Sequence, residues 1–267
     1  MQLGRLAQVS RDAARTVRTS VAQSNPDKVA IVTGAGRGIG RAIAVALARE
    51  GYALCLVART RAELAQTRAL TELAPQSSLI ILLDLAVPEA AANLVSTALE
   101  HYGRIDVIVN NAGWAPARTA LSRMSEDDLD RILAVNLRAP IAITRLAVEA
   151  MTDQGGGTII NIASASAKKT PAGEAVYAAA KAGLVAFTHA AFAELRHRAI
   201  KLTVILPGLV DTALIPANKR LDRAAMLAPA DIAEAVMQIV RTPARACPVE
   251  IAIEPQADPM ARPTREK

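Results

Sequence analysis

The chain has 267 residues, of which 52% are hydrophobic and 21% are charged, so it is long and apolar enough to bury one large core. The formal net charge of +6 raises the question of nucleic-acid binding. However, only 2% of the residues are aromatic, and the stacking surfaces that bind bases need aromatic side chains. The composition therefore predicts one large domain that does not bind nucleic acid, and a positive field that favours an anionic small molecule.

No stretch of the sequence combines the length and the apolar character needed to cross a bilayer, so no membrane contact is expected. The two cysteines, Cys55 and Cys247, show no spacing typical of a metal site or of a disulfide framework. We therefore expect no bound metal, and a cytoplasmic protein with reduced thiols.

The first 26 residues form a basic amphipathic extension before the main domain. Leu6, Val9 and Val17 fall on one helical face, while Arg11 and Arg15 lie opposite. Such a segment is similar to organelle-targeting sequences, which makes import into an organelle the alternative to the cytoplasm. A surface helix that packs on a neighbouring subunit, or a start codon placed too early, would account for the same pattern.

Residues 27–254 alternate between apolar, β-branched runs and amphipathic stretches, and residues 255–267 form a polar tail. Strands are expected at Lys28–Thr33, Ala53–Ala58, Leu79–Leu83, Ile105–Asn110, Thr158–Ile162, Lys201–Leu206 and Val249–Ile253. Helices are expected near Gly40–Glu50, Arg61–Ala74, Glu89–Tyr102, Glu126–Met151, Glu174–Arg198 and Ala230–Arg241. This alternation predicts an α/β fold, in which a doubly wound, parallel, seven-stranded sheet of Rossmann type forms a single domain.

A glycine-rich turn follows the first expected strand and has the sequence Thr33-Gly34-Ala35-Gly36-Arg37-Gly38-Ile39-Gly40. Glycine lets the backbone approach a phosphate closely, because no side chain stands between them. The free N–H groups of such a turn and of the helix that follows it together hold a pyrophosphate. The turn therefore predicts a dinucleotide site.

A candidate proton donor lies far along the chain from this turn. Tyr177 and Lys181 are four residues apart, so their side chains share one face of the helix expected there. Ser164 precedes Tyr177 by thirteen residues and ends the fifth expected strand. Reduction of a carbonyl needs a proton donor beside the incoming hydride, and a phenol next to an ammonium group suits that role. Together with the phosphate-binding turn, these residues predict nicotinamide redox chemistry.

In this order and at these spacings, the two motifs resemble the short-chain dehydrogenase/reductase family of the single-domain type, across residues 27–254. The resemblance implies that Tyr177 transfers the proton, and that Lys181 lowers its pKa and binds the nicotinamide ribose. It also implies that Ser164 binds and orients the substrate oxygen. Asn136 matches the fourth residue of the family's catalytic set, which holds a water that connects Lys181 to solvent.

Cofactor preference is read at the end of the second expected strand, where a family member that uses NAD usually has an acidic residue. This chain has Ala58, Arg59 and Thr60 there. Arg59 and Arg37 would instead flank the 2′-phosphate of NADP, because guanidinium groups form charge-assisted, often bidentate bonds to phosphate. By resemblance, the other cofactor contacts are Gly34, Gly38, Ile39, Gly40, Asp84 and Leu85, then Asn111, Tyr177 and Lys181, and finally Pro207, Gly208, Val210 and Thr212.

The substrate pocket is less well defined by the sequence. Trp114 directly follows Asn110–Gly113 and either forms a wall of the pocket or packs in the core. Lys168 and Lys169 either attract an anionic substrate or form a solvated pair. The stretch from Thr212 to Leu227 is expected to be an apolar, mobile lid that suits a hydrophobic ketone or acyl chain.

These observations predict an NADPH-dependent reductase that converts a ketone or aldehyde, such as a 3-oxoacyl, cyclic or aromatic ketone, to an alcohol. One alternative is a regulator that senses dinucleotides and has lost the chemistry, and another is an alcohol dehydrogenase that works mainly in oxidation. Family members commonly assemble through the long helices that are expected here at residues 126–151 and 174–198. A homodimer or homotetramer is therefore expected.

Overall fold

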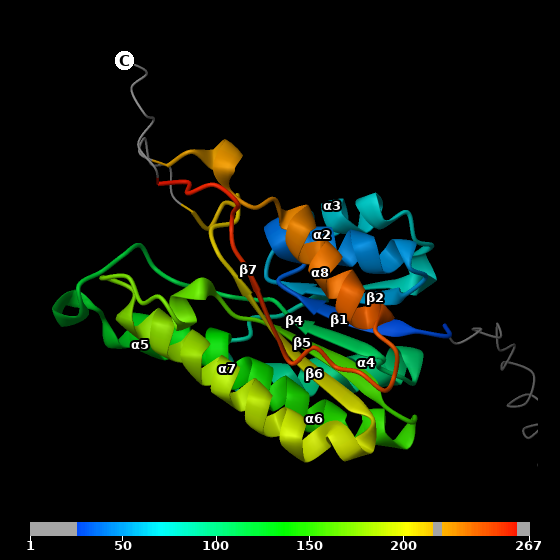
Figure 1. The fold of residues 1–267 in the computed structure, drawn as a ribbon. Coiled ribbons are helices and arrows are strands. Elements are labelled where there is room, and N and C mark those ends of the chain that lie inside the picture. The colour runs from blue at the N-terminus through cyan, green and yellow to red at the C-terminus, as the bar shows by residue number, and fades with distance from the viewer. Residues whose placement is uncertain (1–25, 216–220, 261–267) are drawn as a thin grey trace, which may run out of the picture.

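A computed structural model describes residues 26–215 and 221–260 of the chain. Seven parallel strands form one sheet in the order β3-β2-β1-β4-β5-β6-β7 (Figure 1). The strands are β1 (Val29–Thr33), β2 (Ala53–Ala58), β3 (Ser78–Leu82), β4 (Val107–Asn110), β5 (Gly157–Ile162), β6 (Ile200–Pro207) and β7 (Glu250–Ile253). The predicted doubly wound, parallel sheet of Rossmann type is confirmed.

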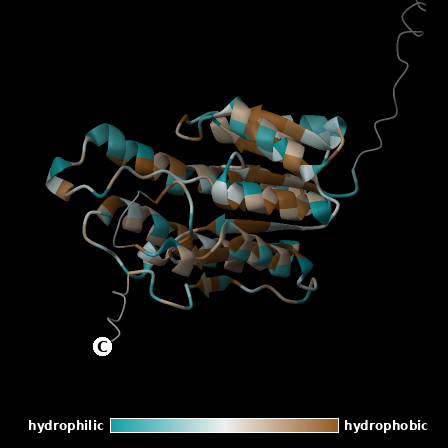
Figure 2. Cartoon of the chain, turned by 90° about the horizontal axis from the view of Figure 1, so that it is seen from above, coloured by the Kyte–Doolittle hydropathy of each residue, from teal (hydrophilic) through white to brown (hydrophobic). Residues whose placement is uncertain are grey.

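Helices cover both faces of this sheet. They are α2 (Gly38–Arg49), α3 (Arg61–Thr71), α4 (Ala90–Tyr102), α5 (Glu126–Leu133), α6 (Ala139–Asp153), α7 (Ala175–Leu195) and α8 (Pro229–Arg241). Apolar residues of α2, α3 and α8 form one core with one face of the sheet, and those of α4, α6 and α7 form a second core with the other face. Figure 2 shows the mostly hydrophobic strands lying between helices that carry hydrophilic segments.

The first strand shows how the sequence produces these two cores. Ala30 and Val32 belong to the core under α2, whereas Val29 and Ile31 belong to the core under α4. Successive side chains of a strand point to opposite faces, so a strand that is covered on both faces must be apolar at every position. This requirement explains why the strands read as continuous apolar runs rather than as alternating patterns.

The candidate site lies where the order of the strands reverses. β1 pairs with β2 on one side and with β4 on the other, so the connections that leave β1 and β4 run in opposite directions. In an open parallel sheet, ligands bind outside the carboxyl ends of the strands at this switch point. The glycine-rich turn follows β1, and the Asn110–Gly113 element follows β4, so both lie at this crevice.

The long helix predicted over Glu126–Met151 is interrupted, which corrects that expectation. Its middle is a π-helical turn, Ala134–Arg138, that separates α5 from α6. Pro140 near the start of α6 has no N–H to donate, which suits a point where the hydrogen-bonding pattern changes. Turns of this kind inside helices occur frequently at functional sites, and this one carries Asn136.

Within the described part of the chain, one helical stretch, Ala175–Arg198, is long and apolar enough to cross a membrane by length and composition alone. The sequence analysis expected no such stretch. This helix packs along β6 and carries the buried side chain of Lys181, and a third of its most apolar window is buried inside the domain. Its composition is typical of a helix that covers a sheet on one face and is apolar on the other.

Parts of three predicted segments lie outside the described residues. They are residues 1–25 of the basic extension, residues 216–220 of the expected lid and residues 261–267 of the polar tail.

Candidate active site

The turn after β1 has a backbone that requires glycine. Gly34 has a φ of 65°, and a Cβ atom there would lie 2.9 Å from Asn111 Nδ2. A Cβ atom on Gly40 would lie 2.2 Å from the carbonyl oxygen of Gly34. Helix α2 begins at Gly38, has no acidic residue in its first turn and receives no side-chain cap from Arg37. The turn and its helix therefore present uncapped N–H groups and open backbone, which fits the pyrophosphate of a dinucleotide.

Asn111 supports this turn from β4. Its Nδ2 donates to the carbonyl oxygens of Thr33, at 2.9 Å, and of Gly34, at 3.3 Å, and its backbone N–H donates to Thr33 Oγ1 at 3.0 Å. The side chain that we expected to contact the cofactor thus holds the glycine-rich turn in place. Whether it also touches the cofactor stays a prediction.

The two arginines predicted to bind a 2′-phosphate both face carboxylates. Arg37 is well exposed, and its Nη1 lies 3.9 Å from an oxygen of Glu63 in the first turn of α3. Arg59 is exposed at the end of β2, and its charge helps to lower the pKa of Asp84. These arginines lie beside the turn and the carboxyl end of β2, as predicted, but each shares its surroundings with an acid.

Asp84, expected at the adenine, is already held by groups of the protein. Its Oδ1 accepts a hydrogen bond from the backbone N–H of Ala86 at 3.0 Å, and its Oδ2 accepts one from Arg131 Nη2 at 2.8 Å. Burial raises the pKa of Asp84, but these two bonds and the charges of Arg131 and Arg59 together leave it below the ordinary value. Leu85, beside it, is buried in the core under α4.

The segment after β6 reaches the glycine-rich turn. The N–H of Gly208, next to Pro207, donates to the carbonyl oxygen of Ile253 at 2.7 Å. Val210 is buried and forms a parallel bridge with Leu227, so the two ends of the expected lid are joined. A Cβ atom on Gly38 would lie 3.2 Å from Thr212 Cγ2. Segments far apart in sequence therefore meet around the same turn, and Ile39 packs against the core beneath it.

Three of the predicted catalytic residues come from two neighbouring elements, β5 and α7. Ser164 lies two residues after the end of β5, and its Oγ accepts a hydrogen bond from the N–H of Ser166 at 3.1 Å. Tyr177 is half-buried in the first turns of α7. Lys181 is buried, lies with its Nζ 5.8 Å from the centre of the Tyr177 ring, and donates to the carbonyl oxygen of Ile162 at 2.8 Å.

Asn136, the fourth predicted residue, is fully buried in the π-helical turn. Its Nδ2 donates to the carbonyl oxygens of Trp114 and Ile132, at 2.6 and 2.9 Å, and its Oδ1 accepts from the N–H of Trp114 at 3.3 Å. A Cβ atom on Gly113 would lie 3.1 Å from Asn136 Oδ1 and 3.8 Å from Lys181 Nζ. Asn136 and Lys181 therefore meet at the end of β4.

The pKa values of Tyr177 and Lys181 differ from what the resemblance led us to expect. Burial raises the pKa of Tyr177 to about 12, although its hydrogen bond with Ser164 lowers it, and the charge of Glu174 raises it further. Burial also lowers the pKa of Lys181, to about 8. The prediction that Lys181 lowers the pKa of Tyr177 is not met by the protein groups alone, because desolvation weakens the charged form of both side chains.

Glu174 was missed in the sequence analysis, although it precedes Tyr177 by only three residues. Its Oε2 accepts from Ser166 Oγ at 2.9 Å, and its Oε1 accepts from Arg118 Nε at 2.8 Å. Glu174 thereby joins the loop that carries Ser164 to the loop that follows β4. Its position at the start of α7 was visible in the sequence, but its partners lie on other loops.

The remaining predicted substrate residues are also engaged within the chain. The ring of Trp114 lies under the guanidinium of Arg131, at 5.5 Å, and a role as a pocket wall stays a prediction. Lys168 forms an ion pair with Glu250, and Lys169 pairs with Glu254 at 2.9 Å. The two lysines therefore anchor the loop after β5 to β7 and the residues that follow it.

Known proteins resemble this chain in sequence. A sequence model of the family described as short chain dehydrogenase matches residues 28–222. The chain belongs to the short-chain dehydrogenase/reductase family. Short-chain reductase protein NovJ of Streptomyces niveus is 40% identical over 197 residues, which is 74% of each chain.

Solved structures of short-chain dehydrogenases show the same fold. A metagenomic short-chain oxidoreductase in complex with NADP is 32% identical, with a TM-score of 0.75, and the match covers 86% of this chain and 98% of the other. The 3-ketoacyl-(acyl-carrier-protein) reductase from Brucella melitensis, complexed with NADH, is 26% identical, with a TM-score of 0.78 and coverage of 87% and 99%. The chain is accordingly an oxidoreductase of this family.

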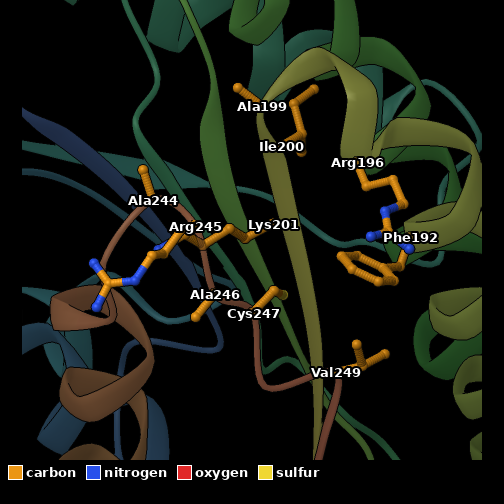
Figure 3. A pocket seen from close by; sticks show the side chains of 10 residues that line it. All are labelled: Phe192, Arg196, Ala199, Ile200, Lys201, Ala244, Arg245, Ala246, Cys247 and Val249. Atoms are coloured by element: carbon orange, nitrogen blue, oxygen red, sulfur yellow. The ribbon is translucent and has the colours of Figure 1, made fainter.

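A separate pocket lies where β6 begins, at the end of that strand away from the candidate active site. It has a volume of about 260 Å³, and Phe192, Arg196, Lys201 and Arg245 contribute to its lining (Figure 3). It includes no residue of the predicted catalytic set.

No cluster of histidine, cysteine and acidic residues that could hold a metal occurs in residues 26–215 and 221–260.

Proposed function

We propose that this chain is an NADP(H)-dependent reductase that converts the carbonyl group of a ketone or aldehyde to an alcohol. The observation that carries the proposal is that Ser164, Tyr177, Lys181 and Asn136 come together at the carboxyl ends of β4 and β5, next to the glycine-rich turn. Cyclic, aromatic and 3-oxoacyl ketones are the substrate classes that suit the apolar residues of the expected lid.

In this proposal Tyr177 supplies the proton. A reduced nicotinamide, when bound, would supply a hydride for the carbonyl carbon, and the oxygen would then need a proton from the protein. Ser164 Oγ holds that oxygen, and the Tyr177 hydroxyl gives it a proton. Burial raises the pKa of Tyr177 to about 12, so the phenol carries its proton near neutral pH and has one to give to the alkoxide.

Lys181 is proposed to hold the nicotinamide ribose and to assist Tyr177. Its Nζ has the carbonyl oxygen of Ile162 as a partner and two further donors available, since an ammonium group has three. The proposed role of Asn136 is to position the end of β4 and a water that links Lys181 to solvent. The hydrogen bonds that Asn136 makes with the backbone of Trp114 support the positioning role.

The preference for NADP rests on Arg37 and Arg59 and on the absence of an acid directly after β2, where Arg59 and Thr60 stand. The similar oxidoreductase bound to NADP supports it, whereas the similar reductase bound to NADH shows that the family accepts either cofactor. Glu63 lies beside Arg37, and its carboxylate also affects the choice between NADP and NAD.

A homodimer or homotetramer built through α6 and α7 is part of the proposal. Only a third of the most apolar window of the α7 stretch is buried within the domain, which leaves part of this helix available for contact with a second subunit. A cytoplasmic location stays a prediction, because the residues with the targeting-like pattern lie outside the described part of the chain.

The two alternatives make different predictions about the site. A dinucleotide sensor has no chemical need for Ser164 and Tyr177, whereas both are present here, and Ser164 lowers the pKa of Tyr177. A dehydrogenase that works in oxidation would use the same residues, with Tyr177 accepting the proton of an alcohol, so turnover in the two directions separates it from the reductase.

The test is to measure oxidation of NADPH and NADH side by side with 3-oxoacyl thioesters, cyclic and aromatic ketones, quinones and aldehydes. Reduction of at least one class, faster with NADPH, is the expected result. Binding of both cofactors without reduction, followed by turnover of alcohols with NADP, would favour the oxidative alternative. Binding without turnover in either direction would favour the sensor.

A further inference from the structure

Glu63 occupies an unexpected position at the dinucleotide site. It lies in the first turn of α3, three residues after Thr60, the N-cap residue of that helix. A Cβ atom on Gly36 would lie 2.9 Å from both the Cβ and an oxygen of Glu63. The carboxylate therefore rests directly against the backbone of the glycine-rich turn, between the turn and the end of β2.

The carboxylate also engages Arg37, the nearest candidate for a 2′-phosphate ligand. The separation between Glu63 Oε1 and Arg37 Nη1 is 3.9 Å, and the Arg37 side chain is 62% exposed. An exposed pair at this distance contributes little stability. Glu63 is thus not held in place mainly by Arg37, and its carboxylate lies beside any phosphate that Arg37 binds.

A third arginine near the turn, Arg41, is engaged with the turn itself. Arg41 Nε donates to the carbonyl oxygen of Gly36 at 3.1 Å and to Thr67 Oγ1 at 3.1 Å, so it is used to fix the turn. Thr67 Oγ1 donates to the carbonyl oxygen of Ala35 at 2.9 Å. The turn beneath Glu63 is therefore held by hydrogen bonds from Arg41 and Thr67, which oppose a shift that would move a phosphate next to Arg37 away from the carboxylate.

We infer that Glu63 is a specificity-determining residue of the dinucleotide site, which weakens binding of a 2′-phosphate and so keeps the site open to NAD as well as NADP. The inference rests on the proposed dinucleotide site, and it names the residue that limits the preference for NADP. Like charges at a partly exposed surface repel by an amount that changes a binding constant several-fold. If Glu63 instead orders Arg37 to bind the phosphate, then removal of its charge would weaken binding of the 2′-phosphate.

The experiment uses 2′,5′-ADP and 5′-AMP, two fragments that differ only in the 2′-phosphate, and measures their binding to the full chain by calorimetry. Glu63→Gln keeps the size of the side chain and removes its charge. We expect 2′,5′-ADP to bind about fivefold more tightly to Glu63→Gln, and 5′-AMP to change by less than about twofold. Glu63→Asp, which keeps a charge, should stay close to the original ratio of the two affinities.

Glu72→Gln is the matched control, because it makes the same change of net charge at the other end of α3. It should leave both fragments unaffected. Unchanged or weaker binding of 2′,5′-ADP to Glu63→Gln would overturn the inference. A failure of the proposed NADP preference looks different: the unaltered chain would then bind 5′-AMP as well as 2′,5′-ADP, whatever Glu63→Gln does.

Discussion

Among the residues that the structure describes, Lys181 is the only lysine, arginine, aspartate or glutamate with a buried side chain. Burial of a charged group costs free energy unless partners replace its water, and the Ile162 carbonyl replaces only part of it. The cost appears as a pKa lowered to about 8. A side chain that lowers stability in this way fits a catalytic role better than a structural one.

This cost predicts how stability changes with pH. The pKa of Lys181 is about 8 in the folded chain and 10.5 for an unperturbed lysine, so between these values the unfolded chain binds the proton more tightly. Stability should therefore rise with pH in this window. Relative to Lys181→Met, the free energy of unfolding of the unaltered chain should rise by about 2 kcal/mol between pH 7.5 and 9.5.

Urea unfolding of both proteins at several pH values measures this difference. The other groups that titrate in this range are common to both proteins, so they cancel. If the free energies of unfolding of the two proteins change with pH in parallel, then Lys181 keeps its ordinary pKa in the folded chain.

Residues of the motifs were predictable from the sequence because local spacing defines them. Tyr177 and Lys181 share a helical face by their separation alone. Glu174 and Glu63 were not identified, since what they do depends on Arg118, Ser166 and the turn at Gly36, which lie on other loops. Side-chain partners across loops leave no periodic pattern in a sequence.

At the scale of elements, the turn after β1 and helix α2 depend on each other through Gly40. Any side chain at this position meets the Gly34 carbonyl oxygen, because a Cβ atom would lie 2.2 Å from it. Gly40→Ala should therefore force the turn away from the helix N-terminus. We expect binding of 2′,5′-ADP to fall by at least tenfold and stability to fall by about 2 kcal/mol.

Gly51→Ala is the control at the other end of α2. Gly51 has a φ of 85° but no atom within 4 Å of an added Cβ, so alanine there adds strain without a clash. It should lower the free energy of unfolding by about 1 kcal/mol and leave 2′,5′-ADP binding unchanged. Normal nucleotide binding by Gly40→Ala, measured by calorimetry, would show that the turn does not hold the phosphates.

The strands and most helices were predictable because their apolar periods are strong and continuous. β2 has the predicted bounds, Ala53–Ala58. The break in the helix predicted at Glu126–Met151 was not predictable, because the apolar pattern of the sequence continues through it. Its cause is tertiary: Asn136 bonds the backbone of Trp114 from the π-helical turn.

At the scale of the whole molecule, the order of the strands brings the site together. Four parts of the site are far apart in the sequence: the turn at residues 33–40, the end of β4, Ser164 and the segment up to Thr212. All four lie at the carboxyl ends of strands, and these ends meet at one edge of the sheet. The topology was predictable from the alternation of strands and helices. The side chains that occupy the substrate pocket were not, because variable loops supply them.

The measurement that tests the central claim most directly compares the unaltered chain with Tyr177→Phe, using NADPH and the carbonyl compound that the unaltered chain reduces fastest. Phenylalanine keeps the ring and removes the proton donor. General acid catalysis contributes about 10²- to 10⁴-fold, so turnover should fall by at least a hundredfold. NADPH binding, followed by fluorescence, should change by less than about threefold. Turnover by Tyr177→Phe within about tenfold of the unaltered chain would contradict the account, because Tyr177 would then not supply the proton.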